Sequence, residues 1–200
     1  MNILLTNGRL IDPASGRDGV GDVAIQDGRI LALGKAPADF RADRVIDAAG
    51  CIIVPGLIDL AVRLREPGYE HAGMLESEMA AAVAGGVTSL VCPPDTDPVL
   101  DESGLVEMLR FRAEKLNQAR VYPLGALTKQ LRGEALTEMV QLTEAGCVAF
   151  SQADVALVNT QVLARALQYA SSFGYSVWLR PQDHHLGQVR GRARRQDEGG

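Results

Sequence analysis

The feature that most constrains the fold is a regular alternation of two kinds of segment along most of the chain. Short apolar runs typical of buried strands lie at 57–64, 87–92, 120–124, 147–150 and 176–179. Runs of good helix formers separate them, at 74–84, 103–117, 134–144 and 160–171. Strands that alternate with helices at this spacing predict βα units on a parallel sheet, because parallel neighbours need a crossover between them.

Glycine, proline and serine mark the ends of several of these segments. Gly85-Gly86 follows the first helical run, Pro93-Pro94 follows the second strand, and Gly146 follows the third helical run. Ser103 is predicted to cap the helix that follows it, since a serine hydroxyl accepts a hydrogen bond from a free backbone N–H at a helix start. These end signals agree with the periodicity and support the α/β class.

Residues 1–55 have a different pattern, in which short β segments are separated by turn residues. Asp27-Gly28 lies between the apolar runs 23–26 and 29–33, and this pair is a two-residue hairpin signal because glycine permits a positive φ. Further short strands are expected at 44–47 and 51–54. We predict a small N-terminal β unit, a segment of a β-sandwich, over residues 1–55.

Five parallel strands suit either a doubly wound sheet or part of a (β/α)₈ barrel. No Gly-x-Gly-x-x-Gly follows any of the strands, so a dinucleotide-binding sheet has no support. A whole barrel typically needs about 250 residues, which is more than follow residue 55. We therefore predict an α/β chain with a partial TIM-type barrel, about five of eight βα units, over residues 56–187.

The last segment, 188–200, differs from the rest in composition. It carries four of the 20 basic residues and one aliphatic side chain larger than alanine. Such a segment buries too little apolar surface to order itself, so we expect a basic, disordered tail. A barrel of five strands also leaves an open edge that favours aggregation. These features predict a truncated product, from a frameshift for example, that is only marginally stable alone.

The net charge and the cysteine count exclude several classes of protein. The formal net charge is −5, which disfavours binding to nucleic acid or to an anionic membrane. No apolar run approaches the length of a membrane span and the start lacks a basic n-region, so we expect a cytoplasmic protein. Cys51, Cys92 and Cys147 lie far apart, which argues against a disulfide framework and a structural zinc site.

Several motifs at the strand ends, where barrel enzymes place their working groups, carry a family resemblance. They are Pro-Gly-Leu-Ile-Asp-Leu from Pro55, Leu-Arg-Glu-Pro-Gly-Tyr-Glu-His from Leu64, Ala-Gly-Gly-Val-Thr-Ser-Leu-Val-Cys from Ala84, Gly-Ala-Leu-Thr-Lys from Gly125 and Ala-Gly-Cys-Val-Ala-Phe-Ser from Ala145. From residue 2 to about 187 the chain resembles the dihydroorotases of the amidohydrolase superfamily. The resemblance implies a TIM-type barrel that hydrolyses or closes a cyclic amide with one or two zinc ions.

The zinc ligands that this resemblance implies are missing from the positions that align. A His-x-His pair is implied where the chain has Ala61 and Arg63, an acidic ligand where it has Gln152 and Ala153, and a histidine where it has Arg180. A methyl group cannot coordinate a metal, and a guanidinium keeps its proton and repels a dication. The family's remaining ligands would lie beyond residue 200. We therefore predict a lost metal site, no cofactor and no catalytic residue.

The two arginines are predicted to be neutralised by neighbouring carboxylates. Arg63 and Arg180 are expected to pair with Asp59, Asp95 or Asp183, which gives a charge-balanced barrel mouth.

The resemblance also implies that substrate recognition is half retained. It places a substrate carboxylate between an arginine, matched by Arg65, and an asparagine that is Asp95 in this chain. Asp95 would repel a carboxylate. Arg65 is either a remnant of that site or a structural partner of Glu66 or Glu70.

We therefore expect a non-catalytic, dihydroorotase-like protein of pyrimidine biosynthesis. The resemblance implies a partner, the catalytic chain of aspartate carbamoyltransferase, with which a full-length form would make a hetero-oligomer. Two alternatives stay open. One is a zinc-dependent cyclic amidohydrolase of dihydroorotase, hydantoinase or allantoinase type, with ligands drawn from other residues. The other is a metal-free small-molecule binding protein that uses Arg65.

Overall fold

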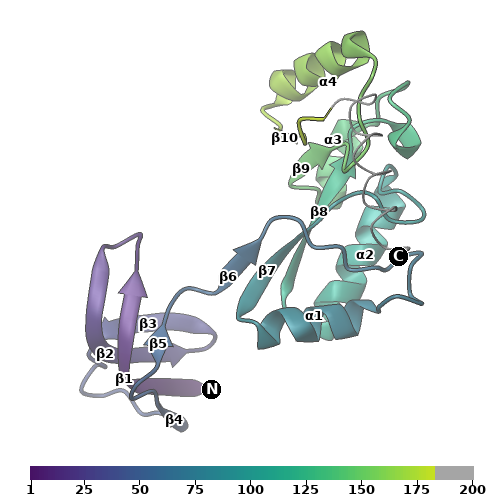
Figure 1. The fold of residues 1–200 in the computed structure, drawn as a ribbon. Helices are drawn as coiled ribbons and strands as arrows, with labels where there is room; N and C mark the ends of the chain where they lie inside the picture. Colours follow the sequence, from purple (N-terminus) through teal and green to yellow (C-terminus); the bar gives the residue numbers. More distant parts are fainter. Residues whose placement is uncertain (183–200) are drawn as a thin grey trace, which may run out of the picture. The chain divides into compact units, whose positions relative to one another are not determined.

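The computed structural model describes residues 1–182, which form two compact units, Met1–Gly56 and a second unit that begins at Leu57. Figure 1 gives the order of their elements along the chain. The predicted tail at 188–200 and the predicted ion-pair partner Asp183 lie outside the described residues. Among the residues that are described, no helix combines the length and the apolar character that a membrane span requires.

The first unit is a five-stranded sheet. Its strands are β1 (Asn2–Asp12), β2 (Arg17–Gln26), β3 (Arg29–Gly34), β4 (Arg44–Asp47) and β5 (Ile52–Ile53). The order is β3-β2-β1-β4, with β5 also on β1; β1 to β3 are antiparallel, and β4 and β5 run parallel to β1. Asp27 and Gly28 both have positive φ, 49° and 74°, as the predicted two-residue hairpin requires.

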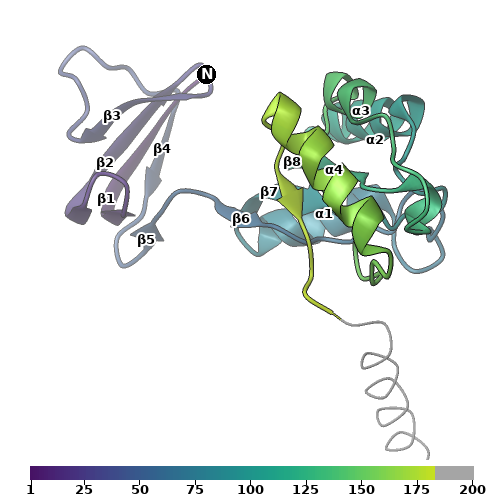
Figure 2. The ribbon, with the colours of Figure 1, turned by 90° about the horizontal axis from the view of Figure 1, so that it is seen from above.

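The second unit is built on a parallel sheet with the strand order β10-β9-β8-β7-β6. The strands are β6 (Leu57–Asp59), β7 (Val87–Cys92), β8 (Arg120–Ala126), β9 (Ala149–Ser151) and β10 (Val177–Trp178). The helices between them are α1 (Leu75–Ala84), α2 (Ser103–Leu116), α3 (Met139–Ala145) and α4 (Thr160–Phe173), with a short 3₁₀ turn, η1 (Lys129–Leu131). Figure 2 shows the four helices of this unit beside its strands. The predicted α/β class is confirmed.

The alternation of side chains along these strands separates two apolar clusters. Leu90 and Phe150 belong to the main core, together with residues of all four helices such as Met79, Leu109 and Ala166. Their sequence neighbours Val91 and Ala149 belong to a second, smaller cluster with Leu124. Since successive side chains of a strand point to opposite faces, the helices cover one face of the sheet and the small cluster lies on the other.

The predicted helix at 134–144 is wrong over its first five residues, because α3 begins only at Met139. Residues 135–137 instead pair with the segment that follows β8: Lys129 N donates to Ala135 O at 2.8 Å, and Leu136 forms an isolated bridge with Thr128. The buried Thr137 hydroxyl donates to Ala126 O at 2.6 Å. These bonds offer the backbone an alternative to the helix, which good helix formers alone do not reveal.

Two further boundaries differ from prediction. The expected strand 57–64 ends at Asp59, and beyond it Val62 N still donates to Val91 O of β7 at 2.9 Å. Ser103 is not the cap of α2: Glu102 occupies the N-cap position with extended backbone, and Ser103 is the first helical residue. The cap residue therefore lies one position earlier than the serine signal indicates.

Candidate functional site

The carboxyl ends of the five parallel strands surround one cavity of about 400 Å³. Residues that follow β6, β7, β9 and β10 line it, and Leu124 contributes from within β8. Four of the positions where the resemblance implies zinc ligands meet here, namely Ala61, Arg63, Ala153 and Arg180. The chain therefore brings these positions together at the end of the sheet where barrel enzymes build their sites.

Arg63 and Arg180 are both bound by carboxylates at this cavity. Arg63 Nε donates to Asp95 Oδ2 at 2.8 Å, and its Nη2 donates to Asp154 Oδ2 at 2.7 Å. Arg180 Nη1 donates to the other oxygen of the same carboxylate, Asp154 Oδ1, at 2.8 Å. The four side chains form a continuous chain, which we call the Asp154 network: Asp95, Arg63, Asp154 and Arg180.

The predicted neutralisation of the arginines is confirmed for the pair Arg63–Asp95. For Arg180 and Asp59 the observed partners differ from the predicted ones. Arg180 pairs with Asp154, and Asp59 accepts a hydrogen bond from the backbone N of Ala61 at 3.0 Å without pairing with either arginine. A backbone donor two residues away competes for the Asp59 carboxylate, as short acidic side chains commonly allow.

The electrostatics of the Asp154 network favour the charged forms of Asp154 and Arg63. The hydrogen bond from Arg180, helped by the charge of Arg63, holds the pKa of the Asp154 carboxyl below its usual value. The hydrogen bond to Asp95 raises the pKa of the Arg63 guanidinium. Two cations and two anions therefore face one another with no net charge.

The residues at this cavity do not fit a zinc ion. Zinc takes imidazole nitrogen, thiolate or carboxylate oxygen, whereas the implied ligand positions present methyl groups and guanidinium groups, and the two nearby carboxylates bind those guanidinium groups. Within residues 1–182, no three His, Cys, Asp or Glu side chains gather closely enough to hold a metal ion. Burial raises the pKa of the nearby Cys92 thiol to about 12, so it stays protonated at neutral pH.

Gln152 turns its amide into the protein and away from the cavity. It is 2% exposed; its Oε1 accepts from Thr128 Oγ1 at 3.0 Å and its Nε2 donates to Leu131 O at 2.8 Å. The donor to Leu131 O would be lost with a carboxylate at this position. The amide therefore stabilises the loop around η1, and the next residue, Ala153, has a positive φ of 50°.

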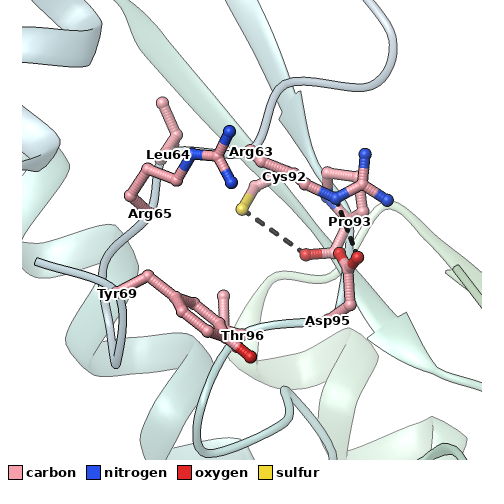
Figure 3. Close-up of a pocket in the computed structure, with 8 residues that line it drawn as sticks. All are labelled: Arg63, Leu64, Arg65, Tyr69, Cys92, Pro93, Asp95 and Thr96. Atoms are coloured by element: carbon pink, nitrogen blue, oxygen red, sulfur yellow. Dashed lines mark hydrogen bonds and ion pairs between the residues drawn. The ribbon is translucent and has the colours of Figure 1, made fainter. Parts of the chain in front are cut away.

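A second, smaller pocket of about 180 Å³ contains both predicted remnants of substrate recognition. Arg65 and Asp95 line it with Tyr69, Thr96 and Cys92 (Figure 3). One oxygen of Asp95 accepts the hydrogen bond from Arg63. Arg65 has a left-handed backbone conformation, with φ of 65°. A non-glycine residue in this conformation costs energy and is often found at functional sites.

The structural alternative for Arg65 is wrong. Among the described residues it forms no ion pair; Glu66 pairs with Arg112, and the Glu70 carboxylate accepts from Gly68 N at 3.0 Å. Glu66 is 2% exposed, and its other oxygen accepts from Leu75 N, the first residue of α1, at 3.1 Å. One buried carboxylate therefore joins the loop after β6 to the start of α1 and to α2.

Sequence reasoning missed Asp154 and Glu66 as organising residues. Asp154 lies three residues after the end of β9, and this strand-end position of an acidic side chain was the only available signal. Glu66 carries no pattern that distinguishes a buried carboxylate from a solvated one, since its partner Arg112 is 46 residues away in sequence.

Comparisons with known proteins agree with the fold. A family model described as "Dihydro-orotase-like" matches residues 50–187. A "Dihydroorotase-like protein" of Pseudomonas putida is 50% identical and one of Pseudomonas aeruginosa is 48% identical, while a "Dihydroorotase" of Syntrophotalea carbinolica is 43% identical. Each alignment covers 93% of this chain but 44% of the relative, so the chain spans less than half the length of these relatives.

Two solved structures illustrate the fold that this chain shares. The L-hydantoinase of Arthrobacter aurescens superimposes with a TM-score of 0.79 at 21% identity, over 99% of this chain and 44% of that one. A dihydroorotase superimposes with a TM-score of 0.62 at 18% identity, over 91% and 51%. These likenesses confirm the predicted partial barrel with its small N-terminal β unit. Because the family model matches residues 50–187, more than half of this chain, the chain belongs to the dihydroorotase-like family.

Proposed function

We propose that this chain is a non-catalytic, dihydroorotase-like protein of pyrimidine biosynthesis. The observation that carries the proposal is the Asp154 network: guanidinium groups of Arg63 and Arg180 stand at two implied ligand positions, and carboxylates already bind both. A neutral loss at these positions would leave space for a metal held by other residues. A bound cation opposes a dication at the same place.

The names of the relatives support the same reading. Two relatives at 50% and 48% identity are named "Dihydroorotase-like protein", and a relative at 43% identity is named "Dihydroorotase". The chain therefore shares more residues with these two proteins, whose name stops short of the activity, than with the relative at 43% identity. Fold and function separate easily within a family, because the reaction depends on a few side chains that the fold only presents.

The lost activity is tested by metal analysis and turnover together. The purified chain, and the longer product where the gene encodes one, is measured for zinc content and for hydrolysis of dihydroorotate beside an active dihydroorotase. We expect no stoichiometric zinc and no turnover above the uncatalysed rate. Zinc at one equivalent or more with turnover of dihydroorotate, of a hydantoin or of allantoin would replace this proposal with the cyclic amidohydrolase.

The proposed role of such a protein is structural, as the partner of the catalytic chain of aspartate carbamoyltransferase in a hetero-oligomer. A fold that has lost its site persists when its surface still binds a partner. Light scattering on a sizing column, with and without the transcarbamoylase of the same source, tests this. We expect one shared peak of defined mass, and two separate peaks of well-folded proteins would remove this partner.

One observation favours a second candidate function, the binding of a small carboxylate without a metal. The guanidinium of Arg65 lines the 180 Å³ pocket and forms no ion pair among the described residues. Calorimetry with carbamoyl aspartate and dihydroorotate tests this function. Binding that disappears in Arg65→Ala and persists in Arg65→Lys would support it, whereas equal heats from all three proteins, or none, would reject it.

A further inference from the structure

The Asp154 network connects the two edges of the parallel sheet. β6 and β10 are the edge strands, with β7, β8 and β9 between them. Arg63 lies four residues after the end of β6, Arg180 lies two residues after the end of β10, and both donate to Asp154, which follows β9. Residues 91 positions apart in sequence, Arg63 and Asp154, are therefore in direct contact.

This contact joins residues whose strands are three positions apart, so the Arg63 and Asp154 side chains and the loops that carry them span that separation, which a curved sheet shortens. Neighbouring strands lie about 4.8 Å apart, so β6 and β9, three positions apart, would be separated by about 14 Å in a flat sheet. The Arg63 Nη2 to Asp154 Oδ2 distance is 2.7 Å. The cavity of about 400 Å³ is consistent with curvature, since residues from all five strands or their following loops line it.

The chemistry of the network suits a bridge between elements. The Asp154 carboxylate uses its two oxygens separately, Oδ2 for Arg63 and Oδ1 for Arg180, so each bond is made to a different strand end. Arg63 divides its donors in the same way, with Nε on Asp95 after β7 and Nη2 on Asp154 after β9. The rigid fork of a guanidinium fixes the direction of both bonds.

We propose that Asp154, bound at once by Arg63 and Arg180, ties the carboxyl ends of the two edge strands together and holds the curvature of the sheet without a metal ion. The side chains that the zinc site lacks are thus replaced by residues with a mechanical role. This inference goes beyond the proposed loss of catalysis, since arginines could occupy these positions without joining any strands.

Residue-resolved hydrogen exchange on the chain tests the tie. Two amides report on the edges: Val62 N, bonded to Val91 O, on the β6 side, and Phe150 N, bonded to Ser176 O, on the β10 side. Asp154→Asn keeps the shape and removes the charge. We expect exchange at both amides to rise by up to about 5-fold, while the β7–β8 ladder keeps its protection.

Asp18→Asn is the matched control. Asp18 binds Arg9 at 2.7 Å in the first unit, so the substitution removes the same kind of bond without touching the second sheet. It should leave the exchange rates of the Val62 and Phe150 amides unchanged. A rise at Phe150 alone would reduce Asp154 to a local partner of Arg180, and a uniform rise across all five strands would make it a general stabiliser; either result overturns the proposal.

Single arginine variants keep the proposal testable if Asp154→Asn does not fold. Arg180→Gln cuts the link from Asp154 to the β10 side and leaves both ion pairs of Arg63 intact. Arg63→Gln cuts the link from Asp154 to the β6 side together with the bond to Asp95, and leaves Arg180 paired with Asp154. The proposal expects each variant to expose both reporting amides. Exposure of only the edge next to the substituted arginine would show two independent ion pairs and overturn the tie.

Discussion

The two units of the molecule use the same chemistry over very different distances along the chain. In the first sheet Arg9 binds Asp18 across a hairpin, nine residues away, with both side chains about half exposed. In the second sheet Arg63 binds Asp154 across 91 residues and three strand positions. The bond lengths are the same, 2.7 Å. The two pairs differ in how closely the local backbone structure alone brings their residues together.

The hairpin that carries Arg9 and Asp18 is specified locally, because a turn and an antiparallel ladder bring the two residues to diagonally neighbouring positions, with Asp18 paired to Ile11 and Arg9 paired to Val20. The parallel sheet needs helices as crossovers, and its pairings close long loops whose entropy must be repaid by later contacts. A local pair therefore adds little stability to a hairpin that backbone hydrogen bonds already hold, whereas a long-range pair can stabilise the arrangement of separate strands.

The largest expected effect is on the unfolding free energy of the second unit, when a large side chain is removed from its core and not from the core of the first unit. Phe150 is 1% exposed and packs 5.6 Å from the Tyr175 ring, centroid to centroid. Phe150→Ala should lower the free energy of unfolding of the second unit by about 3–5 kcal/mol, since it leaves a cavity. Hydrogen exchange followed through a urea titration measures this. Val23→Ala in the first sheet is the control, and a loss of protection in both units from either variant would show that they unfold as one.

A second variant tests the buried carboxylate that joins α1 and α2. Glu66→Gln leaves Arg112 without its ionic partner, and Glu66→Ala also removes the acceptor of Leu75 N. We expect Glu66→Ala to cost about 3 kcal/mol of unfolding free energy, measured by chemical denaturation. Glu70→Gln, four residues away and exposed, should change little. Equal losses of unfolding free energy from Glu66→Ala and Glu70→Gln would mean that the buried Glu66 carboxylate contributes no more to stability than the exposed Glu70 carboxylate.

The pH dependence of the second sheet should report on Asp154. Its pKa is lowered in the folded chain, so its stabilising effect is fully present above the ordinary carboxyl pKa of about 4 and is lost as pH falls through the lowered value. With Asp154 half exposed, we expect at most about 1 kcal/mol. The difference in unfolding free energy between the chain and Asp154→Asn should be constant from pH 8 to about 5 and shrink below about 4. A difference that grows towards low pH would contradict this.

The sequence allowed the sheet to be predicted because its signals are local. The alternation of strands and helices, the Asp27-Gly28 turn and the glycine after α3 each depend on a few neighbouring residues. The predicted start of α3 was wrong because the Thr137 hydroxyl donates to Ala126 O, a tertiary contact that overrides helix propensity. At the site, the pairing of Arg63 with Asp95 followed from two adjacent strand ends. The role of Asp154 depends on sheet curvature, which no local pattern encodes.

The smallest expected effect completes the comparison between the two ion pairs. Arg9 and Asp18 hydrogen-bond through two donors, Nε and Nη2 at 2.7 and 2.8 Å, in contact with solvent. Water and salt screen such a pair, and the hairpin holds its shape through backbone bonds. Arg9→Ala should therefore leave the unfolding midpoint unchanged within error in 0.15 M salt, a typical physiological ionic strength, by circular dichroism. Arg63→Ala under the same conditions should lower it, and the reverse ranking would show that distance along the chain does not decide which pair matters.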